Sequence, residues 1–410
     1  MNVRASISLV HSISSQAPTN NGTTSFKQVA WGKSGASALY RHSRASIAVI
    51  SRSNLPHIDP LSKLRGKISK MKLSAGESQT KICADHREAR AEVIADKHAD
   101  TKVPVFDISG LEGAERKLIS QQIADTSESW GIFQIVNHGI DPCLMQAAKD
   151  VSKEFFYLPD EEKMKIKVVG IEGWNHSKLA GVSGEGKLYK PGTVEHLYLV
   201  QSPDTQEHLE RYPRNPPAYR TTILEYAKKL KVLHEKLIAV LSEMLGLKPD
   251  ALTLAITTPV GNVTMRTNFY AFNADGKGSP GVCHAHTDPG GLTILLADDV
   301  PGLEVNKDGR WVPVNPIPGA FIVNIGDVLE ILSNGRYKSV EHRGLPSQTE
   351  ERLTMASFYG GSHEVIIGPL PELLDEKHPP RYRTCSFGDY IADFVKAGLD
   401  GKNGLERMKL

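Results

Sequence analysis

The chain has 410 residues, of which 40% are hydrophobic and 23% are charged. This composition is typical of a folded protein and excludes collagen-like, fibrous and largely disordered chains. No run approaches the roughly 18 consecutive apolar residues that a membrane-spanning helix needs, so no membrane partner is expected.

The charge is unevenly distributed along the chain. Residues 1–58 contain six Lys or Arg, twelve Ser and no Asp or Glu. Since the whole chain carries +2 and this segment carries +6, the remainder carries −4, which argues against a nucleic acid as partner. A basic, Ser-rich, acid-free start is typical of an organelle transit peptide. We therefore expect a plastid location, with the mitochondrion or the cytoplasm as alternatives.

Residues 59–102 remain polar and charged and are predicted to form a linker. Folded protein is expected to begin near Val103. Strands are predicted over 103–109 and 131–136, and helices over 112–130, over 141–156 and from Pro159. Residues 170–219 are rich in Gly, Pro and aromatic residues and lack a clean period, so long loops are expected there.

The longest predicted helix spans 221–245, where apolar residues recur at helical spacing and Gly246 follows. After it the apolar period changes to two. Strands are predicted over 263–272, 292–297, 321–325, 339–342 and 353–359, with turns at 306–309 and 333–335. Many short strands separated by turn residues indicate a sandwich or barrel with helices packed around it.

Two glycine-rich segments match phosphate-binding motifs but lack their context. Residues 181–187 have the GxxxxGK spacing, yet Leu188 stands where a hydroxyl residue is required. Residues 276–281 match GxGxxG, but Pro280 lies inside the motif and a strand is expected after it. Neither an NTPase nor a dinucleotide-binding fold is therefore predicted.

The segment from Cys283 to Asp288 carries a candidate metal site. His286 and Asp288 are two residues apart, so in an extended chain their side chains point to one face. His342, on another predicted strand, supplies a second imidazole. Two His and one carboxylate, with the other positions open, is the ligand set of non-haem Fe(II) oxygenases. His284 shares the same face and is the alternative ligand, but only His286 has an Asp two residues later.

A candidate anion site lies on the neighbouring predicted strands. Arg352 and Thr354 are two residues apart and share one face. A guanidinium and a hydroxyl together can bind a small carboxylate, and one charge-assisted hydrogen bond contributes roughly 1.5–3 kcal/mol. Asn268 and Tyr270 lie on the preceding alternating strand, from which the phenol can reach the same anion.

Taken together, these segments resemble the plant soluble Fe(II)/2-oxoglutarate-dependent dioxygenases, a family that includes flavonoid, gibberellin and ethylene-forming oxygenases. The resemblance covers about residues 103–400 and also includes the segments 130–139, 318–327 and 332–343. It implies a mixed α and β fold: a double-stranded β-helix (jelly roll) with an N-terminal helical region and a C-terminal helix. The expected parts are an N-terminal dioxygenase region (103–220), a support helix and connection (221–257), the jelly-roll domain (258–370) and a C-terminal helical segment (371–410).

The resemblance also implies roles for individual residues. Fe(II) would be bound by His286, Asp288 and His342, and 2-oxoglutarate by Arg352, Thr354, Tyr270 and Asn268. Two further positions, Phe358 and Arg266, match substrate contacts of relatives. O2 is the other co-substrate, and ascorbate is the expected reductant. The implied reaction releases succinate and CO2 while hydroxylating or desaturating a small hydrophobic metabolite of plant secondary metabolism, of phenolic, flavonoid or hormone-like type.

Some residues depart from the family pattern, and other functions stay open. Thr354 replaces the usual Ser and keeps its hydroxyl, whereas 271–276 replace a Pro-rich stretch, so no single relative indicates the substrate. One alternative is a catalytically silent relative that binds a small molecule. Another is a zinc-dependent hydrolase with the same three ligands, which would have no use for Arg352. The oligomeric state is not determined by the sequence, and a monomer is the expectation.

Overall fold

The computed structural model describes residues 102–166, 168, 172–176, 194–201, 206–258, 261–270, 283–345, 347, 350–398 and 401–410. The predicted transit peptide (1–58), nearly all of the predicted linker and both glycine-rich motifs lie outside these residues. Within the described residues, no helix combines the length and the apolar composition that a membrane span requires.

The N-terminal elements follow the predicted order with shorter bounds. They are β1 (Val105–Asp107), a 3-10 helix (Ser109–Glu112), α2 (Arg116–Ser129), β2 (Ile132–Val136), α3 (Pro142–Phe156) and α4 (Asp160–Lys163). Helix α3 begins at Pro142 because the Asp141 side chain accepts a hydrogen bond from the Cys143 N–H, 2.9 Å away. Strand β2 enters the large sheet beside β1 and β10.

The prediction of long loops over 170–219 is wrong for much of that segment. It contains β3 (Gly173–His176), β4 (Val194–Val200) and α5 (Gln206–Glu210), while 177–193 lies outside the described residues. Strand β4 pairs with β5 over its whole length, and its alternate residues Leu197 and Leu199 are buried. The strand therefore depends on pairing with a segment about 70 residues later in the sequence, which local composition does not reveal.

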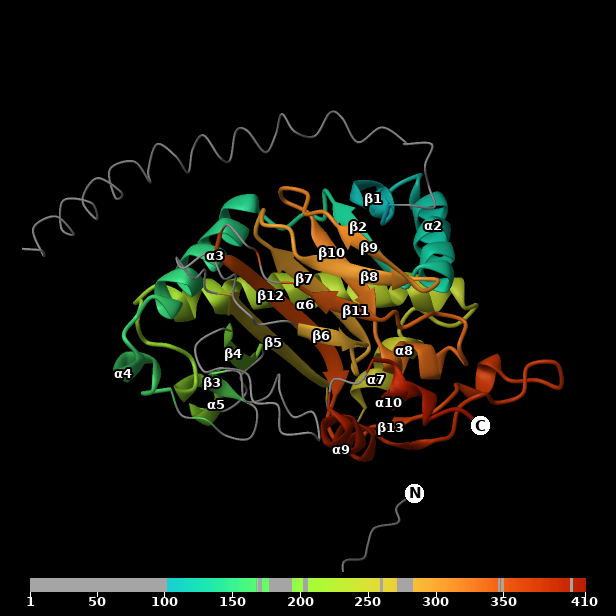
Figure 1. The fold of residues 1–410 in the computed structure, drawn as a ribbon. Coiled ribbons are helices and arrows are strands. Elements are labelled where there is room, and N and C mark those ends of the chain that lie inside the picture. Colours follow the sequence, from blue (N-terminus) through green and yellow to red (C-terminus); the bar gives the residue numbers. More distant parts are fainter. Residues whose placement is uncertain are drawn as a thin grey trace, which may run out of the picture. The chain divides into compact units, whose positions relative to one another are not determined.

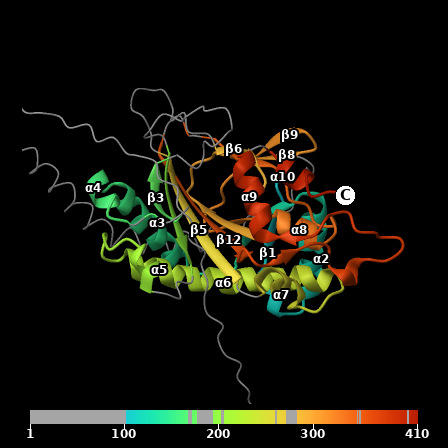
Figure 2. The same ribbon diagram turned by 90° about the horizontal axis from the view of Figure 1, so that it is seen from below.

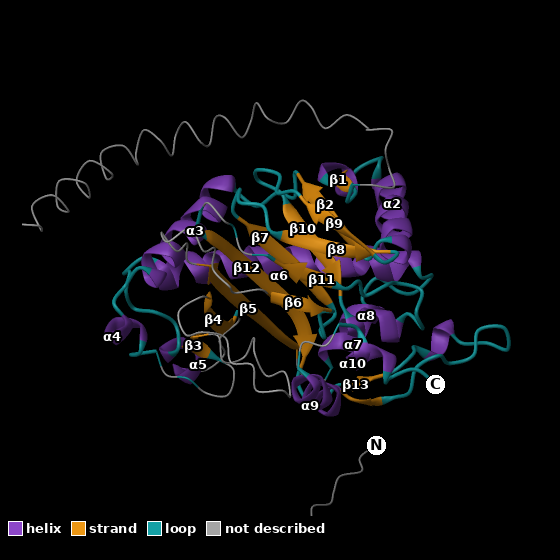
Figure 3. Ribbon diagram, viewed as in Figure 1, coloured by secondary structure: helices purple, strands orange, loops and turns teal. Residues whose placement is uncertain are grey.

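Two antiparallel sheets form the core of the protein (Figures 1 and 3). The eight-stranded sheet has the order β1-β2-β10-β7-β12-β5-β4-β3, with β5 (Gly261–Tyr270), β7 (Leu292–Ala297), β10 (Phe321–Ile325) and β12 (Arg352–Gly361) at its centre. The four-stranded sheet has the order β6-β11-β8-β9, formed by β6 (Cys283–His286), β11 (His342–Gly344), β8 (Leu303–Lys307) and β9 (Arg310–Val314). Among the paired strands of the described residues, β1 and β2 run parallel and the other pairs are antiparallel. This confirms the mixed fold with a jelly-roll core.

The two faces of the large sheet have different neighbours. The long helix α6 (Tyr219–Met244) runs along one face (Figure 2). Leu230 and Leu237 of α6 join a single apolar core with Leu353 and Met355 of β12. Burying one such side chain contributes about 1.5–3 kcal/mol. Because strand residues alternate, the neighbouring β12 residues, among them Arg352, face the other way, toward the small sheet.

The segments after β7 show one predicted turn and one correction. The turn at 306–309 joins β8 to β9, with Asp308 and Gly309 at positive φ of 51° and 82°. The turn at 333–335, in contrast, ends a helix, α8 (Asp327–Leu332), that the sequence did not predict. A short helix, α7 (Ala251–Thr257), follows α6. The chain after β12 contains β13 (Ile366–Ile367), a 3-10 helix (Pro371–Leu373), β14 (Cys385–Ser386), α9 (Phe387–Ala397) and α10 (Asn403–Glu406).

Candidate metal centre

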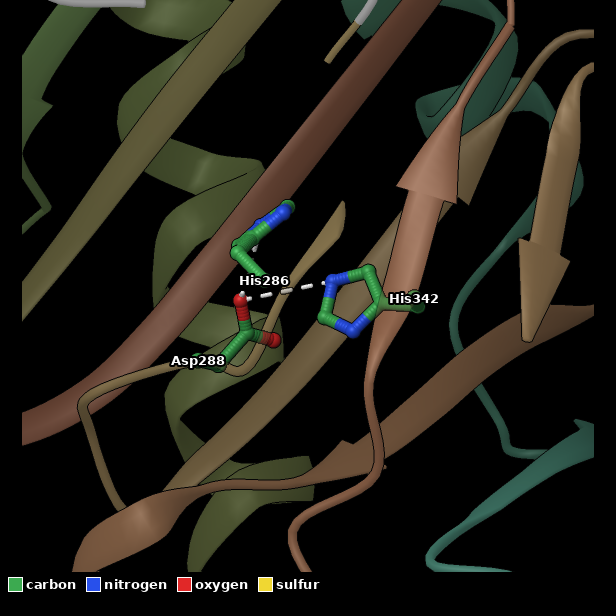
Figure 4. A group of neighbouring side chains, drawn as sticks. All are labelled: His286, Asp288 and His342. Atoms are coloured by element: carbon green, nitrogen blue, oxygen red, sulfur yellow. Dashed lines mark ion pairs between the residues drawn. The ribbon is translucent and has the colours of Figure 1, made fainter. Parts of the chain in front are cut away.

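His286 and His342 lie directly opposite each other on paired strands. Strand β6 pairs with β11 so that His286 stands opposite His342, and cross-strand neighbours project to the same side of a sheet. Their ring centroids are 4.4 Å apart. Asp288 follows β6 by two residues and points at both rings (Figure 4). Potential ligand atoms of the three residues all lie within 4.8 Å of one another.

Both imidazoles direct the same nitrogen toward the carboxylate. His286 Nε2 lies 3.7 Å and His342 Nε2 lies 3.5 Å from Asp288 Oδ1. The other ring nitrogen, Nδ1, is 2.7 Å from the His284 carbonyl oxygen in His286 and 3.2 Å from the Val340 carbonyl oxygen in His342. Nδ1–H donation to a carbonyl leaves the Nε2 lone pair free, as in metal-binding histidines.

Buried charges give the site a preference for a cation. Burial acts to raise the pKa of Asp288, but His342, His286 and nearby hydrogen-bond donors outweigh it and lower that pKa. Burial lowers the pKa of His342, which favours its neutral form. For His286, burial acts to lower the pKa, but Cys283 and Asp288 outweigh it and raise it to about 9. A metal ion would therefore displace a proton from His286 and meet an ionised carboxylate.

The carboxylate of Asp288 is held by the large sheet. Asn324 of β10 donates its side-chain N–H to Asp288 Oδ2 at 3.3 Å. The alternative ligand His284 is exposed and does not belong to the cluster of three. His284 precedes His286 by two residues on β6, but Asp288 and His342 are buried whereas His284 is exposed.

The four residues of the candidate anion site lie on one face of β5 and β12. Arg352 pairs with Tyr270 and Thr354 pairs with Asn268 across the two strands. Arg352 is only 2% exposed, its Cζ lies 5.1 Å from the Tyr270 ring centroid, and its Nε donates to the Val300 carbonyl oxygen at 3.3 Å. Among the described residues it forms no ion pair with a carboxylate, although its charge also favours the ionised form of nearby Asp298. A buried guanidinium without an ion-pair partner indicates an anionic ligand.

A cavity of about 280 Å³ opens beside the metal cluster. His286 and Asp288 line one end of it, and Phe358 and Arg266 line its sheet wall. Arg266 is half-buried, and its Nε atom has no hydrogen-bond partner among the described residues. The two residues expected to contact substrate therefore lie in one cavity with two of the three candidate ligands.

Other residues of the cavity were missed in the sequence analysis. His196 and Tyr198 come from β4, opposite Asn268 and Arg266. The opposite wall comes from α9, through Phe387, Ile391, Phe394 and Val395. The signals were present: Leu197 and Leu199 alternate in β4, and the apolar residues of α9 recur at helical spacing. Their place beside the cavity was not apparent, because no local pattern shows which sheet face a distant helix covers.

Two family models match this chain. The 2OG-Fe(II) oxygenase superfamily matches residues 261–361. The model described as non-haem dioxygenase in morphine synthesis N-terminal matches residues 103–219. The first range contains every residue of the metal cluster and of the candidate anion site.

Curated relatives match over most of their length. Jasmonate-induced oxygenase 2 of Arabidopsis thaliana is 36% identical over 310 residues, which cover 75% of this chain and 82% of that protein. Flavonol synthase/flavanone 3-hydroxylase of Arabidopsis thaliana is 37% identical over 292 residues, which cover 70% and 84%. The relatives thus include proteins named for different substrates.

Solved structures share the fold. JOX2 in complex with 2OG, Fe, and JA superposes with a TM-score of 0.68 at 33% identity, covering 79% of this chain and 97% of that chain. The dioxygenase for auxin oxidation in rice has a TM-score of 0.63 at 29% identity, covering 75% and 100%.

Proposed function

This chain belongs to the plant Fe(II)- and 2-oxoglutarate-dependent oxygenases, and from that premise we propose its substrate type and the roles of its residues. It is an oxidoreductase that uses iron and 2-oxoglutarate. We propose that it hydroxylates or desaturates a small hydrophobic plant metabolite, of phenolic, flavonoid or hormone-like type, with release of succinate and CO2. The cavity beside the metal cluster supports this proposal most directly.

His286, Asp288 and His342 are the proposed ligands of Fe(II). Two imidazole nitrogens and one carboxylate oxygen on one side of an ion suit Fe(II) and leave positions for co-substrates. The convergence of both Nε2 atoms on Asp288 Oδ1 supports the assignment. A zinc hydrolase could use the same three donors, but its reaction would not require the buried Arg352 as a binding site for a co-substrate carboxylate.

Arg352, Thr354, Tyr270 and Asn268 are the proposed contacts of 2-oxoglutarate. Arg352 can offer two parallel N–H donors to a carboxylate, and the Thr354 hydroxyl and the Tyr270 phenol lie on the same face of the sheet. Asn268 donates its side-chain N–H to Thr354 Oγ1 at 3.2 Å, which orients the hydroxyl. When bound, iron and 2-oxoglutarate supply the oxidising chemistry with O2, and ascorbate is the proposed reductant.

The protein's own contribution at the substrate end is orientation and exclusion of water. Phe358 offers a ring face, and the apolar residues of α9 close the opposite wall. Arg266 offers a charged donor, so the preferred substrate is apolar along most of its length and bears one hydrogen-bond acceptor or acidic group. Such a pocket fixes which C–H bond faces the metal cluster.

Anaerobic titration with Fe(II) and 2-oxoglutarate tests the proposal. We expect the weak visible metal-to-ligand charge-transfer band in the wild-type protein and its loss in His286→Ala. His284→Ala is the matched control and should keep the band, because His284 is exposed. Metal binding without the band would favour the catalytically silent relative or the hydrolase, and normal turnover in His286→Ala would overturn the ligand assignment.

Three further proposals concern the whole chain. The composition of residues 1–58 supports plastid import. We propose the same division that the sequence predicts: an N-terminal region (103–220), a support helix and connection (221–257), a jelly-roll domain (258–370) and a C-terminal segment (371–410). We also retain a monomer with a small-molecule substrate as its partner.

A further inference from the structure

Asp327 contacts residues 286–288, the end of β6 and the turn after it, which we call the ligand loop because it carries two of the proposed metal ligands. It is fully buried, at the first position of α8. Its backbone N–H donates to the Asp288 carbonyl oxygen at 2.8 Å. Its side-chain Oδ2 accepts a hydrogen bond from Thr287 Oγ1 at 3.1 Å. Main chain and side chain of Asp327 thus both hold the segment from His286 to Asp288.

The same carboxylate oxygen is bonded to the C-terminal helix. Tyr390 of α9 donates its hydroxyl to Asp327 Oδ2 at 2.5 Å, and Tyr390 is 3% exposed. One residue later Ile391 lines the cavity, and Phe394, one turn further, does the same. One oxygen atom therefore joins the helix that forms the cavity wall to the loop that holds the metal ligands.

A second connection ties the C-terminal segment to strand β6. The Gly401 N–H donates to the Ala285 carbonyl oxygen at 3.0 Å, and Gly401 forms a β-bridge with His286. Gly401 has φ of +58°, and an added Cβ would lie 2.6 Å from Glu341 Oε1. A side chain at this position would therefore disturb the bridge. The two connections lie on either side of His286, one through Thr287 and one through Ala285.

We propose that Asp327 and Tyr390 are positioning residues that make helix α9 part of the metal centre. This inference rests on the proposed function, because it assumes that His286 and Asp288 bind the metal. Asp327 sets the position of the ligand loop, and Tyr390 sets the position of Asp327. Contact between substrate and α9 is in this way transmitted to the metal ligands through two hydrogen bonds.

The chain offers a matched control for this proposal. Tyr382 is also buried and also donates its hydroxyl to a buried carboxylate of α8, Glu330 Oε1, at 2.7 Å. Glu330 Oε2 in turn accepts from the Ser339 N–H and from Lys402 Nζ, neither of which belongs to the ligand loop. Tyr382→Phe therefore removes an equivalent hydroxyl that is bonded to the same helix. Among the described residues, its carboxylate partner does not contact residues 286–288 and reaches the metal centre only through the neighbours of Ser339 and Lys402.

Co(II), as a spectroscopic substitute for Fe(II), is titrated into the full-length wild type, Tyr390→Phe and Tyr382→Phe, and thermal unfolding is measured in parallel. We expect both variants to unfold at similarly lowered temperatures. Tyr390→Phe should bind Co(II) about tenfold more weakly, which is the lower end of the effect of losing an outer-sphere partner. Tyr382→Phe should keep the wild-type Co(II) affinity within twofold.

A second pair of variants repeats the test at the other donor. Thr287→Val should weaken Co(II) binding as Tyr390→Phe does, whereas Thr287→Ser keeps the hydroxyl and should restore wild-type affinity. These variants decide the question if Tyr390→Phe does not fold. Equal Co(II) affinity in Tyr390→Phe and Tyr382→Phe, with wild-type binding intact, would overturn this inference alone. Absence of Co(II) and Fe(II) binding in the wild type would overturn the proposed function.

Discussion

Replacement of Arg352 by Leu separates binding of the co-substrate from binding of the substrate. Leu fills part of the buried space that the aliphatic part of Arg352 occupies, but it lacks the charge and the N–H donors. Arg352 forms no ion pair with a described carboxylate, although its charge also favours the ionised form of nearby Asp298. Asp298 keeps the Leu353 N–H and Lys153 Nζ as partners after the replacement. The hydrogen bond to the Val300 carbonyl oxygen is also lost, but an acceptor beside an open anion site can be satisfied by water.

The size of the effect follows from the bonds that are removed. One charge-assisted hydrogen bond contributes roughly 1.5–3 kcal/mol, and a guanidinium can make two to one carboxylate. Thr354 and Tyr270 remain and keep part of the binding energy. A net loss of about 3 kcal/mol corresponds to a rise in the 2-oxoglutarate requirement of roughly a hundredfold. Arg352→Lys keeps the charge but not the planar pair of donors, so its effect should be about tenfold.

The assay is succinate release as a function of 2-oxoglutarate and, separately, of substrate, together with the anaerobic charge-transfer titration. Arg343→Leu is the control, because Arg343 follows His342 on β11 but contacts Glu304 and the Trp311 ring instead. We expect only Arg352→Leu to raise the KM for 2-oxoglutarate. An equal rise in both KM values, or the same rise in Arg343→Leu, would refute the proposed role.

Two further predictions concern pH and the N-terminal segment. Burial lowers the pKa of His234 to about 3, against about 6.5 in an unfolded chain. Between these two values the unfolded state binds more protons, so the free energy of unfolding decreases as the pH is lowered. The loss should be about 2 kcal/mol between pH 7 and pH 5, and denaturant unfolding of His234→Gln should show a correspondingly smaller loss; an unchanged pH dependence would contradict the reasoning. Deletion of residues 1–58 should leave turnover intact and change the location of a tagged protein in plant cells, and identical locations with and without the segment would disprove the transit prediction.

The alternation of side chains along strands is a local property, so features that depend on it could be predicted from the sequence. Residues two apart share a face of a strand whatever the strand pairs with, so the common face of Arg352 and Thr354 on β12 followed from their spacing. Asp288 lies beyond the end of β6, so its closeness to His286 depends on the turn after the strand and not on alternation. The helical period likewise placed α6 within two residues at its N-terminal end and one at its C-terminal end.

Features that depend on contacts between distant segments became apparent only in the folded structure. The register that sets His286 opposite His342 joins residues far apart in sequence, and β4 exists as a strand because β5 pairs with it. The apolar spacing of α9 was present in the sequence, but it did not show that the helix forms a wall of the cavity or that Tyr390 bonds to Asp327. Hydrogen bonds and packing between distant segments depend on the folded arrangement of both partners, and neither partner's local sequence contains that information.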